Sequence, residues 1–202
     1  MRLILIRHGE SQHGVRGVIA GVKGCTGLTE RGVRQAQEFA ENIAHTGEFN
    51  DCGVLLCSPV LRARQTAEVL LSGLPAESME EDYGLCEVHP GEADGLSWVD
   101  YRARYGTFDL ITSPDRPFSP GGESWSEFLL RVRSTLDRLA AQYAGQTVVA
   151  VTHAGFIVAS FLVLFDIPRP GTGARLDPEY LSITEWSVEE GTWRLVQFNR
   201  NV

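Results

Sequence analysis

Three short apolar runs constrain the fold of this chain most strongly. They span residues 3–6, 53–57 and 147–152. Each predicts a short buried strand, because an unbroken apolar run is typical of a strand that is covered on both faces. Amphipathic helical patterns lie between the runs, beginning with residues 30–45, where Thr29 can cap the first turn. This alternation predicts an α/β fold in which the three strands are parallel.

The remaining segments complete the expected order of elements. They predict helices at about 59–71, 97–105, 123–143 and 155–165, a further strand at 76–81, and a C-terminal antiparallel hairpin made by 181–187 and 193–198. Residues 82–121 are irregular and rich in glycine, proline and acidic residues, yet side chains such as Trp98 and Tyr101 allow them to pack. We expect this segment to be an active-site cover inserted into a single domain of residues 1–202.

The charge of the chain excludes some partners. Its formal net charge is −8, which argues against non-specific binding to nucleic acids or to anionic membranes. Of its 18 cationic residues only Lys23 is a lysine, and arginine is well suited to hold phosphate or carboxylate groups bidentately. We therefore expect a small-molecule anionic substrate and no nucleic acid. An edge strand or the hairpin could pair two copies into a homodimer.

The sequence also indicates a cytoplasmic protein. No signal peptide is evident, because a strand begins within two residues of the amino terminus. The longest apolar run, 156–165, is well short of the roughly 20 residues that a membrane-spanning helix needs. The cysteines show no zinc-like spacing and are expected to be reduced packing residues: Cys25, Cys52, Cys57 and Cys86. No metal site is expected.

Reactive side chains follow the buried strands at the points where they end. Arg7 and His8 end the first run, Arg62 lies just after the second, and His153 follows the third. Right-handed crossovers bring the carboxyl ends of parallel strands to one edge of a sheet, where ligands bind in open α/β folds. These side chains should therefore meet in one site at this edge of the sheet. A glycine-rich stretch at 9–28 could cradle a ligand beside them or form a mobile surface loop.

This set of side chains suits phosphoryl transfer. Fixed cations stabilise the charge on the transferred group, and an imidazole can attack phosphorus and hold the group covalently. The leaving alkoxide then needs a proton, which a carboxyl group can supply. Glu87 is the best placed candidate, in the loop after the strand at 76–81. Three other carboxylates compete with it on sequence grounds alone: Glu10, Glu92 and Asp94.

Six ordered motifs resemble the histidine phosphatase superfamily, in the branch that includes cofactor-dependent phosphoglycerate mutases. They are LIRHGES at 5–11, GLTERG with the following QA at 27–36, SPVLRARQTA at 58–67, LCE with the glycines behind it at 85–96, GGES at 121–124 and VTHAG at 151–155. The resemblance covers nearly the whole chain. It implies a three-layer sandwich with a mixed, mostly parallel sheet and helices on both faces, in agreement with the pattern of elements.

The resemblance also implies roles for individual residues. His8 would be the phosphohistidine nucleophile, and Glu87 would be the proton donor that later activates water. Arg7, Arg62 and His153 would form the phosphate pocket. Further candidates for substrate contact are Ser11, Gly21 and Ala154. The family chemistry needs no metal, and we expect no cofactor. The implied activity is hydrolysis of a small phosphomonoester.

Two departures from the family pattern bear on the substrate. Gly14 stands where the family often has asparagine, so one substrate contact could be lost. The tyrosine, lysine and paired arginines that the mutases carry after the glutamate are absent, and no lysine follows Lys23. This difference favours a phosphatase, with a phosphoglycerate mutase as the alternative.

Two rival interpretations stay open on the sequence alone. Cys25 and Arg31 have the C-x5-R spacing of cysteine-dependent phosphatases, although no buried strand precedes the cysteine. A catalytically silent phosphate-binding module is the second rival. The presence of both histidines, both arginines and Glu87 weighs against it.

Overall fold

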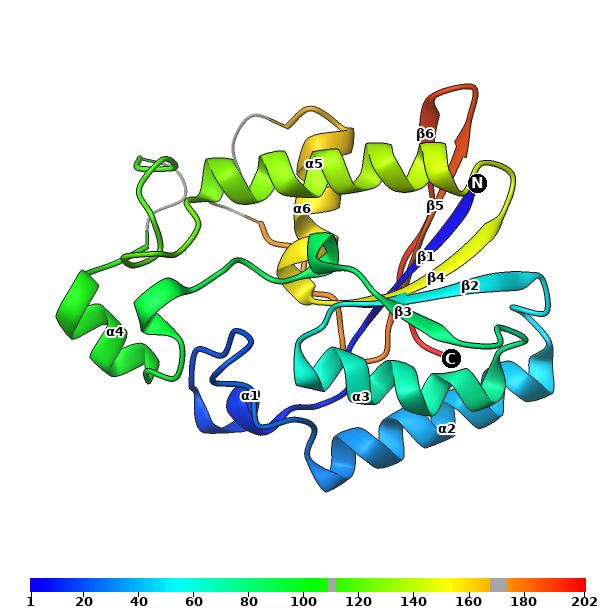
Figure 1. Ribbon diagram of the computed structural model, residues 1–202, viewed down its shortest axis with the longest axis horizontal. Helices are drawn as coiled ribbons and strands as arrows, with labels where there is room; N and C mark the ends of the chain where they lie inside the picture. Colours follow the sequence, from blue (N-terminus) through cyan, green and yellow to red (C-terminus); the bar gives the residue numbers. More distant parts are fainter. Residues whose placement is uncertain (109–111, 168–173) are drawn as a thin grey trace.

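A computed structural model describes residues 1–108, 112–167 and 174–202, and shows an α/β fold built on one six-stranded sheet (Figure 1). The strand order is β3-β2-β4-β1-β5-β6. The strands are β1 (Arg2–Arg7), β2 (Cys52–Cys57), β3 (Met79–Glu81), β4 (Thr147–Thr152), β5 (Ile183–Glu189) and β6 (Thr192–Arg200). The first four in this order pair in parallel, whereas β5 and β6 are antiparallel. The prediction of a mixed, mostly parallel sheet with a C-terminal hairpin is confirmed.

Helices cover both faces of the sheet, as Figure 1 shows. On one face lie α2 (Glu30–Thr46) and α3 (Leu61–Leu70), and on the other lie α5 (Trp125–Gln142) and α6 (Ala154–Leu164). Alternate residues of β1 pack to opposite sides: Leu3 joins the cluster under α5 and α6, and Ile4 joins the cluster under α2 and α3. Apolar side chains thus cover both faces of the sheet, which explains why the central residues of β1 and β4 are apolar.

The ends of the helices follow local sequence signals. The side chain of Thr29 accepts a hydrogen bond from the Gly32 amide at the start of α2. α5 begins with a capping box, in which Ser124 and Glu127 each accept the other's amide N–H. The predicted helices at 30–45, 123–143 and 155–165 therefore differ from the observed ones by at most two residues at each end.

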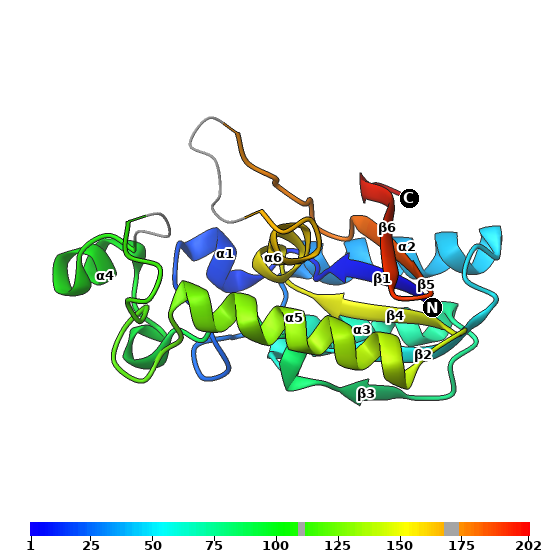
Figure 2. The ribbon, with the colours of Figure 1, turned by 90° about the horizontal axis from the view of Figure 1, so that it is seen from above.

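The 82–121 segment extends beyond the carboxyl edge of the sheet and carries α4 (Trp98–Tyr105), which lies well away from α2, α3, α5 and α6 in Figures 1 and 2. Its residues 109–111 lie outside the described part of the chain. A small separate core of Ile19, Ala93, Tyr101 and Phe118 joins the segment to the glycine-rich stretch. That stretch is folded rather than open, since it contains the short helix α1 (Gln12–Arg16), which the sequence pattern did not predict.

A polar contact ties the same two segments together. The carboxylate of Asp94 accepts hydrogen bonds from the amides of Gly21, Lys23 and Gly24 at 2.8–2.9 Å. Such charge-assisted bonds hold a glycine-rich loop in one conformation. In the described residues, no helix is both long and apolar enough to cross a membrane.

Candidate active site

A cavity of about 370 Å³ opens at the carboxyl ends of β1 and β4. Most of the site residues expected from the sequence line it: Arg7, His8, Ser11, Arg62, Glu87 and Ala154. Two do not. His153 lies behind the cavity, fully buried, with its ring centroid 5.2 Å from that of His8. Gly21 lies outside the lining, and its amide is already bound to Asp94. The structure therefore gives no support to Gly21 as a substrate contact.

Two neighbours fix the proton on the buried imidazole of His8. Its Nδ1 lies 2.7 Å from the carbonyl oxygen of Gly9, which can only accept, so Nδ1 carries the proton. The Nε of Arg62, which can only donate, lies 3.0 Å from Nε2. Nε2 therefore presents its lone pair. Burial, reinforced by the guanidinium of Arg62, holds the pKa of His8 well below its ordinary value, so the ring is neutral near pH 7.

The two arginines are held in place by backbone carbonyls and by an aromatic ring. Arg62, in the first turn of α3, is 2% exposed and donates through Nη1 to the carbonyl of Ala20 at 2.9 Å. Arg7 donates to the carbonyl of Pro178, and its Cζ lies 4.0 Å from the centroid of the Tyr180 ring. The Nε of Arg7 is buried and has no partner. Other atoms of the Arg7 side chain line the cavity, where they can contact an anion.

The first turn of α6 supplies further polar groups at this edge. The Ala154 amide is in that turn, where N–H groups have no partner within the helix. The Nε2 of His153 lies 2.9 Å from Oγ of Ser58, and its Nδ1 is buried without a partner. The hydroxyl of Ser11 is likewise buried and unpaired, and it lines the cavity. Buried polar atoms without partners are rare in native proteins and call for a ligand or water.

Glu87 is the carboxylate that the fold brings to this cavity. Its Oε2 accepts a hydrogen bond of 2.9 Å from the amide of Gly155, and its Oε1 one of 3.2 Å from Val88. A Cβ at position 155 would lie 1.9 Å from Oε1, so a side chain at that position would displace the Glu87 carboxylate. The three competing carboxylates accept hydrogen bonds from other parts of the chain. Glu10 accepts from Thr29 and Arg31, and Glu92 accepts from the hydroxyl of Tyr105. Asp94 accepts from amides of the glycine-rich loop.

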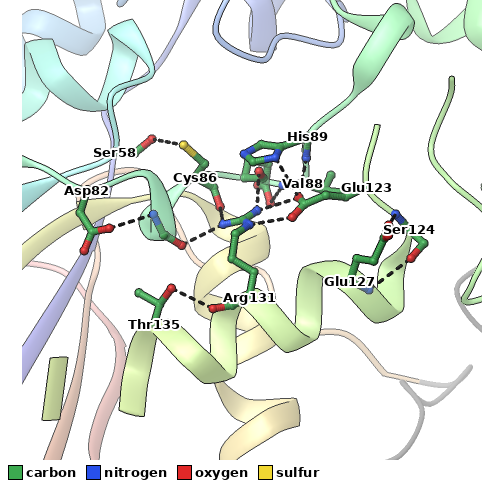
Figure 3. A network of polar contacts seen from close by, with 12 residues as sticks. Ser58, Asp82, Cys86, Val88, His89, Glu123, Ser124, Glu127, Arg131 and Thr135 are labelled. Atoms are coloured by element: carbon green, nitrogen blue, oxygen red, sulfur yellow. Dashed lines mark hydrogen bonds and ion pairs between the residues drawn. The ribbon is translucent and has the colours of Figure 1, made fainter. Parts of the chain in front are cut away.

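The backbone around Glu87 is fixed by Arg131 of α5, a residue that sequence reasoning missed (Figure 3). Its guanidinium donates to the carbonyl oxygens of Gly84, Cys86 and Glu87 at 2.8–3.1 Å. It also forms a bidentate ion pair with Glu123 at 2.7 and 2.8 Å. Burial acts to raise the pKa of Glu123, but the bonds from Arg131 and from the amide of His89 outweigh it, and the pKa is lowered.

Two more residues of the cavity wall were not expected from the sequence. His13 lies on α1 and lines the cavity, with its ring centroid 6.3 Å from that of His8. Burial, with smaller contributions from Arg62 and Arg7, lowers the pKa of His13 to about 4. Tyr180 comes from the far end of the chain. A Cβ at position 14 would lie 2.9 Å from its hydroxyl oxygen, so Gly14 leaves the space that Tyr180 fills.

The alternative nucleophile lies elsewhere. Cys25 is buried among Ala20, Val60 and Cys86 and does not line the cavity. Arg31, its C-x5-R partner, forms a surface ion pair with Glu10 at 3.3 Å. The two residues therefore do not form a phosphate-binding loop. Within the described ranges, no three His, Cys, Asp or Glu side chains are grouped to hold a metal ion.

Together, a neutral histidine whose Nε2 carries a lone pair, the buried Arg62, the half-buried Arg7 and a carboxylate define a cavity suited to a phosphoryl group. A family model described as the histidine phosphatase superfamily, branch 1, matches residues 3–201. The chain belongs to this superfamily.

Individual relatives agree with this assignment. The chain is 29% identical over 213 residues to the adenosylcobalamin/alpha-ribazole phosphatase of Escherichia coli, a match that covers 99% of this chain and 91% of that protein. It is 31% identical over 193 residues to a bifunctional protein of Mycobacterium tuberculosis, with 93% of this chain and 51% of that protein covered. The chain thus spans about half the length of the mycobacterial relatives it matches.

A solved structure shares the fold over almost the whole chain. A mutant of the phosphoserine phosphatase of Entamoeba histolytica, in complex with phosphoserine, superposes with a TM-score of 0.79 at 27% identity. The superposition covers 98% of this chain and 96% of that one.

Proposed function

We propose that this chain is a metal-independent phosphomonoester hydrolase that acts on small phosphorylated metabolites through a phosphohistidine intermediate on His8. The observation that carries the proposal is the pair of contacts that leaves Nε2 of a neutral His8 with a lone pair beside Arg62. Two relatives support it, since they are named as an adenosylcobalamin/alpha-ribazole phosphatase and a phosphoserine phosphatase.

In the first step the phosphoryl group takes the place of His8 as acceptor of the Arg62 Nε–H. The lone pair of Nε2 attacks phosphorus, the ester P–O bond breaks, and its electron pair goes to the leaving oxygen. Glu87 gives that oxygen a proton. The imidazole then carries a positive charge, which the carbonyl of Gly9 stabilises through its contact with Nδ1–H.

In the second step Glu87, now a carboxylate, takes a proton from water. The water oxygen attacks phosphorus, the P–N bond breaks, and the electron pair returns to Nε2. Arg7 and Arg62 stabilise the peripheral oxygens in both steps, because fixed cations need no reorganisation as charge develops. The Ser11 hydroxyl, which lines the cavity and has no partner, provides a further contact to those oxygens.

The proposal is tested by incubating the protein with p-nitrophenyl phosphate in EDTA. We expect release of nitrophenol, and a quenched reaction should contain phosphoprotein that is labile in acid and stable in alkali. The variant His8→Ala should lose both signals, whereas His45→Ala, at an exposed position near the end of α2, should keep them. Phosphate binding without turnover would instead indicate a silent module. Interconversion of phosphoglycerate isomers would indicate a mutase.

A further inference from the structure

The cavity has a second half, which the proposed chemistry does not use. Beyond the phosphate end, its wall consists of apolar side chains: Ile19, Val88, Trp98, Phe108, Phe118 and Trp125. They come from the glycine-rich stretch, the 82–121 segment and the start of α5. A leaving group attached to a phosphate on His8 would lie against this wall.

The aromatic part of the wall is held rigidly. Phe118 packs edge-to-face on Phe108, with ring centroids 4.8 Å apart, and lies 5.9 Å from Trp98. Behind it, Tyr101 stacks on Phe118 at 4.5 Å and donates its hydroxyl to the Phe118 carbonyl at 2.7 Å. Tyr101 is 1% exposed, whereas Trp98 is 43% exposed at the rim. These contacts hold the rings together as one aromatic surface of the cavity wall.

This half of the cavity offers no charge to a second anionic group. Among the described residues, the cations that line the cavity are Arg7 and Arg62, both at the phosphate end. Arg116 is directed instead to the backbone carbonyls of Tyr105 and Thr107. His13 is neutral near pH 7, because its pKa is about 4. A carboxylate on the leaving group would meet apolar rings, and burying it there without a partner is costly.

We propose that the cavity selects phosphomonoesters whose organic part is uncharged, apolar and large enough to stack on these rings, such as a ring-bearing alcohol. This inference rests on the proposed function, and it names the substrate class of the same site. The volume of about 370 Å³ lies at the lower end of the roughly 300–1,000 Å³ typical of ligand pockets, which suits one compact organic group. Compact carboxylated phosphates such as phosphoserine should be poor substrates.

The test compares two esters with the same reacting atoms, benzyl phosphate and 4-carboxybenzyl phosphate. We expect kcat/KM to be about 10- to 100-fold higher for the uncharged ester, the range by which a pocket of the wrong polarity discriminates. O-phosphoserine should be hydrolysed more slowly still. Equal or faster hydrolysis of the carboxylated esters would overturn the inference.

A substitution of Trp98, at the rim of the cavity, tests the inference through the ratio of kcat/KM for the two esters. This ratio does not depend on the overall activity of the variant. Trp98→Arg should lower kcat/KM for benzyl phosphate and raise it for 4-carboxybenzyl phosphate, because it replaces an apolar face by a cation. Val99→Arg is the matched control, since Val99 is the next residue of α4, is 68% exposed and does not line the cavity. It should leave the ratio unchanged, and an equal shift in both variants would contradict the assignment.

The proposed function and the proposed substrate class would be contradicted by different results. If no phosphomonoester is hydrolysed and no phosphohistidine forms, the proposed function is wrong. If p-nitrophenyl phosphate is hydrolysed through His8 but the carboxylated esters are preferred, only the substrate class is wrong.

Discussion

The Nε of Arg62 donates a hydrogen bond of 3.0 Å to Nε2 of His8, and both side chains are almost fully buried. This contact places a permanent cation on the nitrogen proposed to attack phosphorus. It keeps that nitrogen unprotonated and aligns the guanidinium with the position that a phosphoryl oxygen would take. The resting site is therefore already arranged for an anion, which the bound phosphate would complete.

Replacing Arg62 by lysine should show how much this alignment contributes. Arg62→Lys keeps a positive charge but loses the planar fork and the donor on Nε, so we expect kcat to fall about 10²- to 10³-fold. The measurement is the rate of His8 phosphorylation in a single turnover. Arg64→Lys, on the same helix but paired at the surface with Glu68 and Glu81, is the control and should be near wild type. A similar loss in both variants would mean that the helix itself is disturbed.

Replacing Glu87 by glutamine should separate the two chemical steps. Glu87→Gln cannot give a proton, so hydrolysis of alkyl phosphates, whose leaving groups are poor, should slow by about 10²- to 10⁴-fold. p-Nitrophenyl phosphate needs no proton on leaving, so it should give a burst of nitrophenol followed by slow turnover. Phosphohistidine should accumulate. Glu92→Gln, at an exposed site outside the cavity, is the control and should show no burst. An equal loss of activity on all esters in Glu87→Gln would rule out the role of Glu87 as the acid.

Arg131 should act on catalysis by positioning Glu87. Arg131→Lys cannot reach three carbonyls and Glu123 together, so the acid loop should loosen. We expect kcat to fall more for alkyl than for nitrophenyl esters, with KM little changed, and a loss of about 1–3 kcal/mol in the free energy of unfolding. Arg133→Lys, an exposed residue of the same helix paired with Asp137, is the control. An equal loss on both ester types would indicate a purely structural role.

The buried histidines should make the protein less stable in acid. The pKa values of His8, His13 and His153 are all lowered, chiefly by burial, so the native state resists protonation while the unfolded chain takes up protons near pH 6.5. The free energy of unfolding should therefore fall as the pH drops from about 6.5 towards 4, by up to about 1.4 kcal/mol per pH unit for each histidine. Urea unfolding at several pH values measures this slope. His13→Gln should make the slope of the free energy of unfolding against pH shallower. His45→Gln is the control, and an equally shallow slope in it would mean that the removal of any histidine has this effect.

Gly14 and Tyr180 should be energetically coupled. The Cβ of Gly14→Ala would lie 2.9 Å from the tyrosine hydroxyl, so we expect a loss of about 1–3 kcal/mol in the free energy of unfolding. Tyr180→Phe removes the clashing oxygen and should recover part of that loss in the double variant. Gly53→Ala is the control, because a Cβ there meets no atom within 4 Å. Strict additivity of Gly14→Ala and Tyr180→Phe would show that the two residues do not compete for this space.

The local pattern of the sequence determined the sheet and the main helices. A short apolar run is typical of a strand that is covered on both faces, and the predicted strand at 147–152 coincides with β4. Parallel pairing then brought Arg7, His8 and Arg62 to one edge, as expected from the right-handed connection rule. α1 escaped prediction because its five residues lie in a glycine-rich stretch with no clear helical period.

Only the tertiary structure decided which side chains face the cavity. Glu87 and Glu92 look alike in the sequence, but the first accepts the amide N–H of Gly155 and lines the cavity, whereas the second binds the hydroxyl of Tyr105 outside it. Tyr180 arrives from a segment more than 160 residues from Gly14, through packing that no local pattern encodes. The direction of a polar side chain depends on distant hydrogen-bond partners and on burial, whereas the period of a strand or helix is set by its own residues.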